Sequence, residues 1–350
     1  MARIKVMIVD DSAVMVRLLS DIVGKDPRIE IVATASNGEE CVQKAKDAKP
    51  QVILMDLEMP VMNGVDAIKE LSRLNMDVAV LAVSAYAKPG FALLEKALEA
   101  GAFDFVLKPA NPLEIEKIAR QITTNIFVAS FSKSKQIPKV TEADLAPKAG
   151  PAGADKPRRY TVVGCSTGGK QSLNQLLPLL PVDFQGTLVV VVHLPAFVVK
   201  QYVKELGKEC KLPVREIEDG REVLPGHVYL AGIGGSDLIV TRPKDQPHPR
   251  FSATMGEVAQ AVASGQTHPS IDVMMESCAK VFGADCAGVL LSGTGRDGVK
   301  GLRHIQVAKG LTMVEDKSSA SVPQLPQAAS EFGSVDKVLH VKEILARIRG

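Results

Sequence analysis

Residues 1–128 alternate between short apolar runs rich in β-branched residues and longer stretches with apolar residues at helical spacing. Five segments have the composition of buried strands: Lys5–Val9, Ile29–Ala33, Val52–Met55, Val78–Val83 and Phe103–Leu107. Five others have the spacing of amphipathic helices: Ala13–Val23, Glu39–Ala48, Val65–Leu74, Ala92–Ala100 and Pro112–Ile126. This alternation predicts a doubly wound parallel sheet, with its functional site at the carboxyl ends of the strands.

The alternation stops in the segment 129–158. The stretch from Ser132 to Arg158 contains four prolines, six basic residues and few large apolar side chains. Such a segment cannot bury enough apolar surface to fold alone. We therefore expect a flexible linker at 129–158, between a first domain at 1–128 and a second domain at 159–350.

The strand and helix pattern resumes at Tyr160. The strand candidates are Tyr160–Gly164, Thr187–Val192, His227–Leu230, Asp237–Val240, Cys286–Leu291 and Leu311–Val314. Glu257–Ala263 and Ile271–Phe282 have helical spacing, and Ser270 is a suitable N-cap for the second of these helices. The fold class expected for the chain is therefore α/β, with two doubly wound parallel-sheet domains.

Composition and charge exclude several classes of function. The chain has 42 basic and 40 acidic residues, so neither nucleic acid nor an anionic membrane is expected as its main partner. It also lacks Trp, which stacking on bases would use. Apolar runs such as Val78–Val83 are far shorter than the ~20 residues of a membrane span. The five cysteines include no C-x-x-C pair, which predicts reduced core thiols in a cytoplasmic protein.

Charged and hydroxyl side chains follow four of the first five strands. Asp10 and Asp11 follow the first strand, Ser84 the fourth and Lys108 the fifth, while Asp56 follows the third. Three carboxylates at one sheet edge repel one another without a hard cation such as Mg²⁺. With that ion, Asp56 would attack a phosphoryl group, and Lys108 and Ser84 would share the charge on its oxygens. Any one of these residues alone is more simply a solvated strand-end group.

Residues 1–128 resemble the receiver domains of two-component response regulators, which have a flavodoxin-like fold. The matching segments are Val9–Ser12, Met55–Pro60, Asn63-Gly64, Ser84-Ala85 and Phe105–Pro109.

The resemblance implies that Asp56 is the phosphoacceptor. It also implies that Asp11 and Asp56 bind Mg²⁺, with help from Asp10 and the Glu58 carbonyl. The residues of the receiver switch would be Ser84, Phe105 and Lys108.

In the second domain, glycines surround a serine directly after a strand. The segment Gly164–Gly169 permits a tight strand-to-helix turn that lifts the Ser166 hydroxyl out of the sheet. His193 follows the most apolar strand, and Asp297 lies in the loop after the strand Cys286–Leu291. Three strands thus bring a serine, a base and an acid to one edge, as nucleophilic catalysis requires.

Each of these residues also has a simpler interpretation. His193 alone could be a buried structural histidine, and Asp297 alone could be a helix cap. The segment Gly293–Gly298 also fits a dinucleotide fingerprint, with Glu315-Asp316 near the offset of a ribose-binding acid. Against a dinucleotide, Asp297 lies in the loop that would hold the pyrophosphate. Two like charges ~4 Å apart cost ~4 kcal/mol at an effective dielectric of ~20.

Residues 160–350 resemble the catalytic domain of chemotaxis protein-glutamate methylesterases, which also deamidate receptor glutamines. The matching segments are Gly164–Gly169, His193 before Pro195, Asp219-Gly220, Pro225–Ala231, Pro269–Val273 and Gly293–Gly298. The resemblance implies a Rossmann-like serine esterase with Ser166 as nucleophile, His193 as general base and Asp297 as its orienting carboxylate. Thr167 and the Thr294 amide occupy the positions where the family lines its oxyanion region.

The chain departs from that family beside these residues. Thr294 stands where the family usually has Met, and Cys165 replaces a usual Ala. Val192 and Leu194 flank His193 where Gln and Met are common, and Val322–Pro326 departs from the usual Gly-Met-Pro. We expect these changes to affect substrate fit and rate, and not the class of reaction.

Together, the two resemblances predict a cytoplasmic, monomeric, phosphorylation-regulated serine hydrolase of chemotaxis adaptation. It would remove methyl esters from glutamyl residues of methyl-accepting chemoreceptors and deamidate their glutamines. A chemotaxis histidine kinase would be the phosphodonor, with Mg²⁺ for receiver phosphorylation and no cofactor for the esterase. Nucleic-acid binding and membrane insertion are not expected. The alternative is a receiver-controlled regulatory module that binds receptors with little catalytic turnover.

Overall fold

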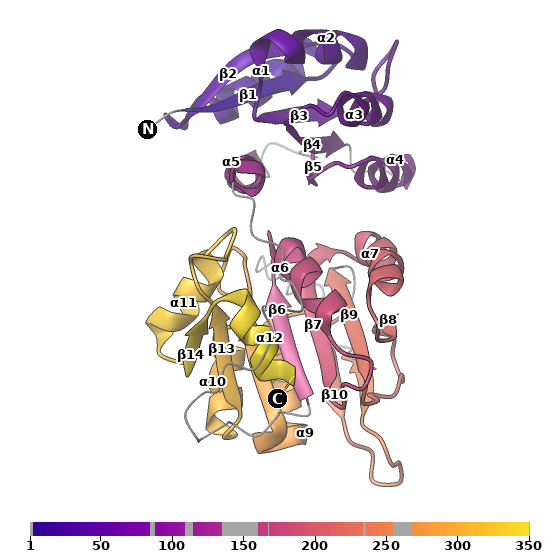
Figure 1. The fold of residues 1–350 in the computed structure, drawn as a ribbon, viewed down its shortest axis with the longest axis vertical. Helices are drawn as coiled ribbons and strands as arrows, with labels where there is room; N and C mark the ends of the chain where they lie inside the picture. Colours follow the sequence, from indigo (N-terminus) through magenta and orange to yellow (C-terminus); the bar gives the residue numbers. More distant parts are fainter. Residues whose placement is uncertain are drawn as a thin grey trace. The chain divides into compact units, whose positions relative to one another are not determined.

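The computed structural model describes residues 3–84, 88–108, 115–134, 160–166, 168–233, 236–254 and 268–349. The chain divides into two compact units, Met1–Ile137 (unit 1) and Pro138–Gly350 (unit 2). Each unit contains its own parallel sheet with helices packed against it (Figure 1).

Unit 1 contains a five-stranded parallel sheet. Its strands are β1 (Ile4–Val9), β2 (Ile29–Ala35), β3 (Val52–Asp56), β4 (Ala79–Ser84) and β5 (Asp104–Leu107). Its helices are α1 (Ala13–Val23), α2 (Gly38–Ala48), α3 (Gly64–Arg73), α4 (Lys88–Glu99) and α5 (Ile115–Ser134). The strand order β2-β1-β3-β4-β5 is the flavodoxin-like order, and it confirms the predicted fold of this part of the chain.

Helices cover the unit 1 sheet, which explains the continuous apolar runs of its strands. Every residue of β3 and β4 is buried. Leu19 of α1 and Ile122 of α5 share one core with Val6 and Ile8 of β1. The remaining helices form a second group, in which α3 contacts both α2 and α4. This packing leaves the carboxyl ends of the strands as the place where polar side chains gather.

Short polar side chains form the N-caps of three of these helices. Ser12, Asn37 and Asn63 each accept a hydrogen bond from the backbone N–H three residues further on. A cap of this kind contributes about 1 kcal/mol to helix stability.

Helix α5 is longer than the sequence predicts. The expected helix ends at Ile126, whereas α5 continues to Ser134 and includes the first residues of the segment predicted as linker. Val128 and Ala129 are buried, so apolar contacts continue past Ile126. The rest of the predicted linker, and the predicted helix Glu257–Ala263, lie outside the described residues.

Unit 2 contains a seven-stranded parallel sheet of order β14-β13-β12-β6-β7-β9-β8. These strands are β6 (Tyr160–Cys165), β7 (Thr187–Pro195), β8 (Val214–Glu216), β9 (His227–Ile233), β12 (Cys286–Leu290), β13 (Leu311–Glu315) and β14 (Lys337–Leu339). The helices are α6 (Gly169–Leu176), α7 (Ala196–Glu209), α9 (Ile271–Phe282), α10 (Val299–Val307), α11 (Gln324–Phe332) and α12 (Val341–Arg349).

The unit 2 sheet separates two apolar cores. Val163 on β6 belongs to the core that contains side chains of α6, α7 and α12. The neighbouring Val162 belongs to the other core, with side chains of α9, α10 and α11. This alternation, with helices on both faces, confirms the prediction of a doubly wound sheet.

One predicted strand does not join the parallel sheet. The segment predicted at Asp237–Val240 forms β10 (Leu238–Thr241), which pairs antiparallel with β11 (Arg250–Ala253). The connection 242–249 contains three prolines. It is also shorter than the dozen or more residues of a parallel crossover. The sequence pattern also missed the short strands β8, β11 and β14.

No described helix meets the length and apolarity of a membrane span.

Val61 carries local strain in the loop between β3 and α3. Its φ is +68°, in the left-handed region where a β-branched side chain is unfavourable, and its side chain is 80% exposed. Val14 on α1 is equally exposed, at 79%, but has an ordinary helical backbone.

We expect Val61→Asn to stabilise unit 1 by about 1 kcal/mol, because Asn tolerates this backbone and little packing is lost. Amide exchange of β3, followed by mass spectrometry on the full chain, should slow by about fivefold at that free energy. Val14→Asn is the matched control and should give no such slowing. Equal exchange in Val61→Asn and the native chain would contradict strain at Val61.

Candidate functional site

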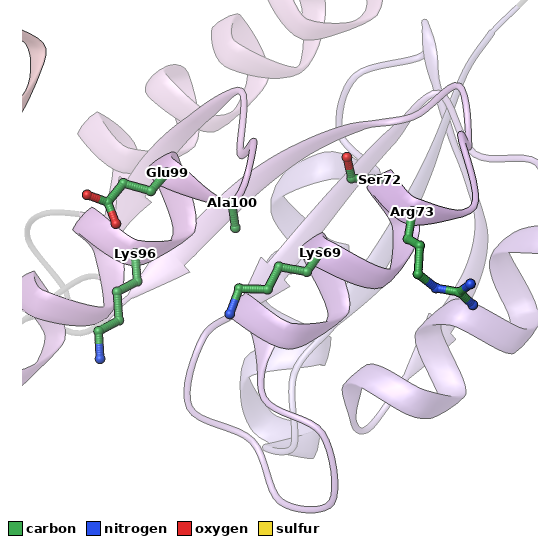
Figure 2. A pocket seen from close by; sticks show the side chains of 6 residues that line it. All are labelled: Lys69, Ser72, Arg73, Lys96, Glu99 and Ala100. Carbon is green, nitrogen blue, oxygen red and sulfur yellow. The ribbon is translucent and has the colours of Figure 1, made fainter. Parts of the chain in front are cut away.

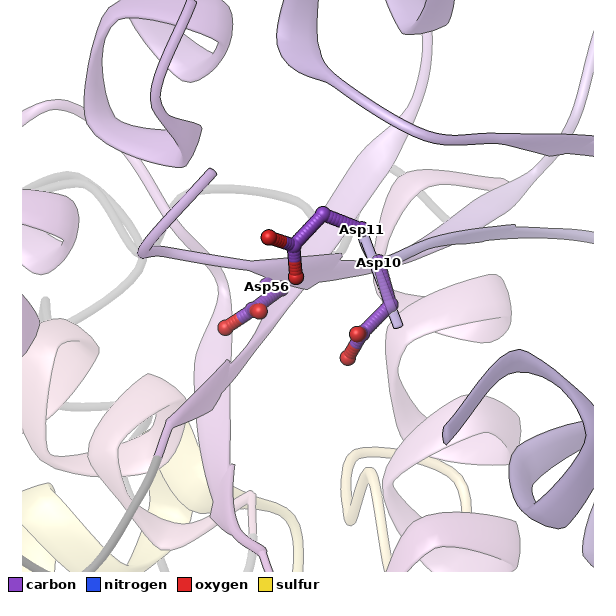
Figure 3. Close-up of side chains that lie close together, drawn as sticks. All are labelled: Asp10, Asp11 and Asp56. Carbon is purple, nitrogen blue, oxygen red and sulfur yellow. The ribbon is translucent and has the colours of Figure 1, made fainter. Parts of the chain in front are cut away.

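Three carboxylates meet at the carboxyl ends of β1 and β3 in unit 1, where the order of the strands in the sheet reverses. Asp10 and Asp11 follow β1, and Asp56 ends the neighbouring strand β3. One carboxylate oxygen from each lies within 4.8 Å of the others (Figure 3). Asp10 and Asp56 are buried, whereas Asp11 is exposed. Closely spaced carboxylate oxygens are the ligands that a hard divalent cation prefers, so these residues fit Mg²⁺.

Lys108 joins two of these acids. Its Nζ lies 2.9 Å from Asp10 Oδ2 and 2.8 Å from Asp56 Oδ2. Burial raises the pKa of Asp56, and the Lys108 hydrogen bond opposes this rise only in part. Burial alone would lower the pKa of Lys108, but its contacts with Asp56 and Asp10 hold that pKa above the ordinary value. The ammonium group of Lys108 therefore stays positively charged between the two buried acids.

The other predicted receiver residues lie around this pair. Ser84 is buried at the end of β4, and its carbonyl accepts a hydrogen bond of 2.7 Å from the Lys108 N–H. Phe105 is buried on β5, next to β4. The Glu58 N–H donates to Asp56 Oδ1 at 3.5 Å, which places the Glu58 backbone beside the acid. The structure thus brings together the receiver residues that the sequence singled out.

A separate hollow in unit 1 is not lined by a cluster of carboxylates. It has a volume of about 700 Å³ and is lined by Lys69, Ser72, Arg73, Lys96, Glu99 and Ala100 (Figure 2). Lys69 and Arg73 already pair with acids of the same helix, Asp66 and Glu70. The chemistry of unit 1 is therefore at the carboxylates.

In unit 2, Ser166 and His193 lie at the carboxyl ends of neighbouring strands. Cys165, the last residue of β6, pairs with Val192 of β7, so Ser166 directly follows β6 and His193 is the next residue of β7, close to its end at Pro195. From β6 the chain builds the sheet first through β7 and later through β12, and binding sites of open α/β sheets form at such a reversal. Within the described residues, no hydrogen bond joins the Ser166 hydroxyl to His193. Such contacts often tighten only when substrate is bound.

Asp297 contacts the ring of His193. Its Oδ2 lies 3.1 Å from His193 Nε2, which leaves Nδ1 as the other ring nitrogen. The same carboxylate accepts hydrogen bonds from the amino terminus of α9: Ser270 Oγ at 2.8 Å, Ile271 N at 2.8 Å and Asp272 N at 3.0 Å. Burial opposes ionisation, but the bonds from His193 and these backbone amides hold the pKa of Asp297 below its ordinary value.

Asp272 makes the reciprocal contact. From the first turn of α9, its Oδ1 accepts hydrogen bonds from Gly298 N at 2.9 Å and Gly301 N at 2.6 Å, at the start of α10. Burial raises the pKa of Asp272, and the nearby charge of Asp297 adds to this rise. The start of α9 is thus bound by Asp297 from the loop before α10, and the start of α10 by Asp272 from α9, which fixes the loop that contains Asp297.

Two close approaches beside Ser166 need glycine, one in the turn that follows it and one in the loop after β12. A Cβ at Gly169 would lie 2.4 Å from Cys165 Cβ, and one at Gly293 would lie 2.9 Å from Ser166 Cβ. Within the described residues, the Thr294 N–H, which the sequence places in the oxyanion region, donates no recorded hydrogen bond. Thr167, the other predicted oxyanion residue, lies outside the described residues.

Glu315, at the end of β13, has a role that the sequence did not indicate. It is 1% exposed, and its carboxylate accepts hydrogen bonds from Ser292 N (2.9 Å), Ser292 Oγ (3.0 Å) and Ser172 Oγ (2.9 Å). Burial raises its pKa. A buried acid whose oxygens are occupied by serines is not available to a ribose, which argues against the dinucleotide interpretation. The available signal was an acid directly after the apolar run Leu311–Val314.

Two family models match the chain: CheB methylesterase over residues 161–348 and response regulator receiver domain over residues 6–120. The protein-glutamate methylesterase/protein-glutamine glutaminase of Halalkalibacterium halodurans is 32% identical, over 98% of this chain and 96% of that protein. A protein of Syntrophomonas wolfei with the same name, numbered 3, is 34% identical over 99% and 98%. The CheB methylesterase catalytic domain of Thermotoga maritima aligns with a TM-score of 0.50 and 30% identity, covering 55% of this chain and 98% of that domain.

We expect Glu315→Gln to raise the melting temperature of unit 2 at about pH 8, because Gln removes a buried charge and keeps an acceptor for Ser292 N–H. Since the folded-state pKa of Glu315 is raised, the cost of its ionisation is absent below the ordinary value of 4.5, grows as the pH rises from there to the folded-state pKa, and is constant above it. The gain in melting temperature should therefore shrink towards about pH 4.

The measurement is near-ultraviolet circular dichroism of the full chain, because three of the four tyrosines (Tyr160, Tyr202 and Tyr229) lie in unit 2. Glu331→Gln, at an exposed glutamate of α11, is the control and should leave the melting temperature unchanged. A gain that is constant with pH would contradict a titrating Glu315.

Proposed function

The chain belongs to the family of CheB methylesterases, with a response regulator receiver domain before the esterase domain, and we propose that Ser166, His193 and Asp297 carry out its hydrolysis. The enzyme is a phosphorylation-regulated protein-glutamate methylesterase/protein-glutamine glutaminase of chemotaxis. The observation that carries the assignment of residues is the contact between His193 Nε2 and an Asp297 pinned by α9. A binding module with little turnover is not favoured, because the curated relatives are named as enzymes.

The first half of the reaction forms an acyl-enzyme. Ser166 Oγ adds to the carbonyl carbon of a γ-methyl glutamyl ester, and its proton passes to His193 Nδ1, since Nε2 is held by Asp297. The Thr294 N–H, and Thr167 beside the nucleophile, would stabilise the oxyanion. The tetrahedral intermediate then expels methanol, which leaves with the proton from His193.

The second half releases the product. Water adds to the acyl-enzyme while His193 takes its proton, and collapse of the intermediate returns Ser166 and frees the glutamyl carboxyl group. With a glutamine substrate the leaving group is ammonia and the same residues act. The ionised Asp297 stabilises the imidazolium that forms in both halves.

The receiver residues accept the phosphoryl group. Asp56 would attack the phosphorus of a phosphohistidine on a chemotaxis histidine kinase, the P–N bond would break to release the histidine, and Lys108 would contact an oxygen of the transferred phosphoryl group. Asp10, Asp11, Asp56 and the Glu58 backbone would hold Mg²⁺, which when bound supplies positive charge to the phosphoryl oxygens. Because Lys108 N–H is bonded to the Ser84 carbonyl, a change at the Asp56–Lys108 pair reaches β4 and β5, where Phe105 lies.

In this assignment, residues 1–128 form the domain that is phosphorylated and residues 159–350 form the domain that hydrolyses the substrate. Helix α5 of the first domain continues to Ser134. The substrates would be methyl-accepting chemoreceptors on their cytoplasmic side, so the enzyme would act in the cytoplasm, as a monomer.

We expect Ser166→Ala to lower kcat for methanol release from methylated receptor membranes by at least about 10⁴-fold, because the nucleophilic oxygen is removed. The fold should persist, since the change deletes one hydroxyl. Ser330→Ala on α11 is the matched control, because that residue is exposed and its hydroxyl donates to the Pro326 carbonyl of the same helix. Methanol release at the native rate by Ser166→Ala would remove Ser166 from the mechanism.

We expect Asp56→Asn to prevent phosphorylation by acetyl phosphate with Mg²⁺, because an amide is a poor nucleophile and a weaker ligand for the cation. Intact-mass spectrometry of the full chain measures the phosphoryl load. Asp47→Asn, at an exposed position of α2, is the control and should load normally. A normal load on Asp56→Asn would place the acceptor at Asp10 or Asp11.

A further inference from the structure

Glu315 binds both elements that flank the nucleophile. Ser292, which donates to its carboxylate from both N–H and Oγ, directly follows β12. Ser172, which donates from Oγ, lies on α6, the helix that begins directly after the nucleophile turn. The hydrogen-bond partners described for the Glu315 carboxylate are serines: Ser172 and Ser292, which join these two elements, and Ser319 in the turn after β13.

Ser292 in turn holds Ser166. The Ser166 N–H donates to the Ser292 carbonyl at 3.1 Å. The next residue, Gly293, lies so close to Ser166 that an added Cβ would be 2.9 Å from its Cβ and backbone N. A displacement of Ser292 therefore displaces the nucleophile.

The same loop also contains the other groups of the site. It continues from Ser292 to Thr294, the proposed oxyanion donor, and to Asp297, which contacts His193. Its far end is fixed by the contacts between α9 and α10, and its near end is fixed by Glu315. A misplacement of about 1 Å at reacting groups can cost about 10²-fold in rate.

We propose that Glu315 is a positioning residue for the hydrolysis, in that its carboxylate fixes Ser292 and thereby sets the place of Ser166, Thr294 and Asp297. This inference rests on the proposed function of Ser166. To hold Ser292 in place, residue 315 must offer an acceptor to the Ser292 N–H at the position of the Glu315 carboxylate. The negative charge itself is not needed. Gln supplies that acceptor and Ala does not.

The experiment compares kcat and KM for methanol release in full-length Glu315→Ala and Glu315→Gln. We expect Glu315→Ala to lose about 10-fold to 100-fold in kcat with little change in KM, because substrate binding does not use the buried carboxylate. Glu315→Gln should retain the native kcat. The rescue by Gln separates positioning from a need for charge.

Asp336→Ala is the matched control. Asp336 accepts the Thr312 N–H at 2.9 Å, at the opposite end of β13, so it ties the same strand without contacting the nucleophile loop. A purely structural role for both acids predicts lower melting temperatures and a native kcat in each folded variant. We expect that result for Asp336→Ala alone.

Three outcomes overturn the proposal: a native kcat in folded Glu315→Ala, an equal loss of kcat in Asp336→Ala, or a loss in Glu315→Gln as large as in Glu315→Ala. If Glu315→Ala does not fold, Glu315→Asp replaces it, because the shorter side chain withdraws the acceptor and keeps the charge. A native kcat in Glu315→Asp then overturns the proposal.

Ser166→Ala, assayed in parallel, separates this proposal from the assignment of the nucleophile. Hydrolysis retained by Ser166→Ala overturns the assignment of Ser166, and the role of Glu315 with it. An inactive Ser166→Ala together with an unaffected Glu315→Ala overturns the role of Glu315 alone.

Discussion

The capping of α9 by Asp297 is the contact on which the hydrolytic edge of unit 2 depends. Three donors at the start of α9 and the His193 ring surround one carboxylate. The amino terminus of a helix favours negative charge, which helps to keep this buried acid ionised. Asp272 returns the contact by capping α10, so the loop between β12 and α10 cannot move without breaking bonds at two helices. The orientation of His193 follows from this loop.

The two units use the same architecture and stabilise buried acids in different ways. In unit 1, Lys108 lies between Asp10 and Asp56, and oxygens remain that can bind a cation. In unit 2, backbone N–H groups and serine hydroxyls surround Asp297 and Glu315. A lysine and a bound cation suit a site that gains and loses a phosphoryl group, because both can compensate its negative charge. Fixed dipoles suit a site whose groups keep one geometry, because they need no reorganisation when charge develops.

Several of these features reduce stability. Burial raises the pKa values of Asp56, Asp272 and Glu315, so each of these carboxyl groups is ionised at the expense of folding free energy. Val61 adds backbone strain a few residues after Asp56. The strands beneath these sites are almost wholly buried, and a buried aliphatic side chain contributes about 1.5–3 kcal/mol. The apolar cores therefore sustain the strained and charged residues at the carboxyl edges.

The sequence by itself determined the alternation of strands and helices, and with it the edge at which Asp56, Ser166 and His193 lie. This was possible because strand-end residues of parallel sheets meet at one edge whatever the details of packing. It did not determine the antiparallel pairing of β10, the full length of α5 or the burial of Glu315, since these depend on contacts with distant segments. Only the tertiary structure decided which nitrogen of His193 meets Asp297, and that α9 and α10 cap each other. Those contacts join residues far apart along the chain, and local periodicity contains no information about them.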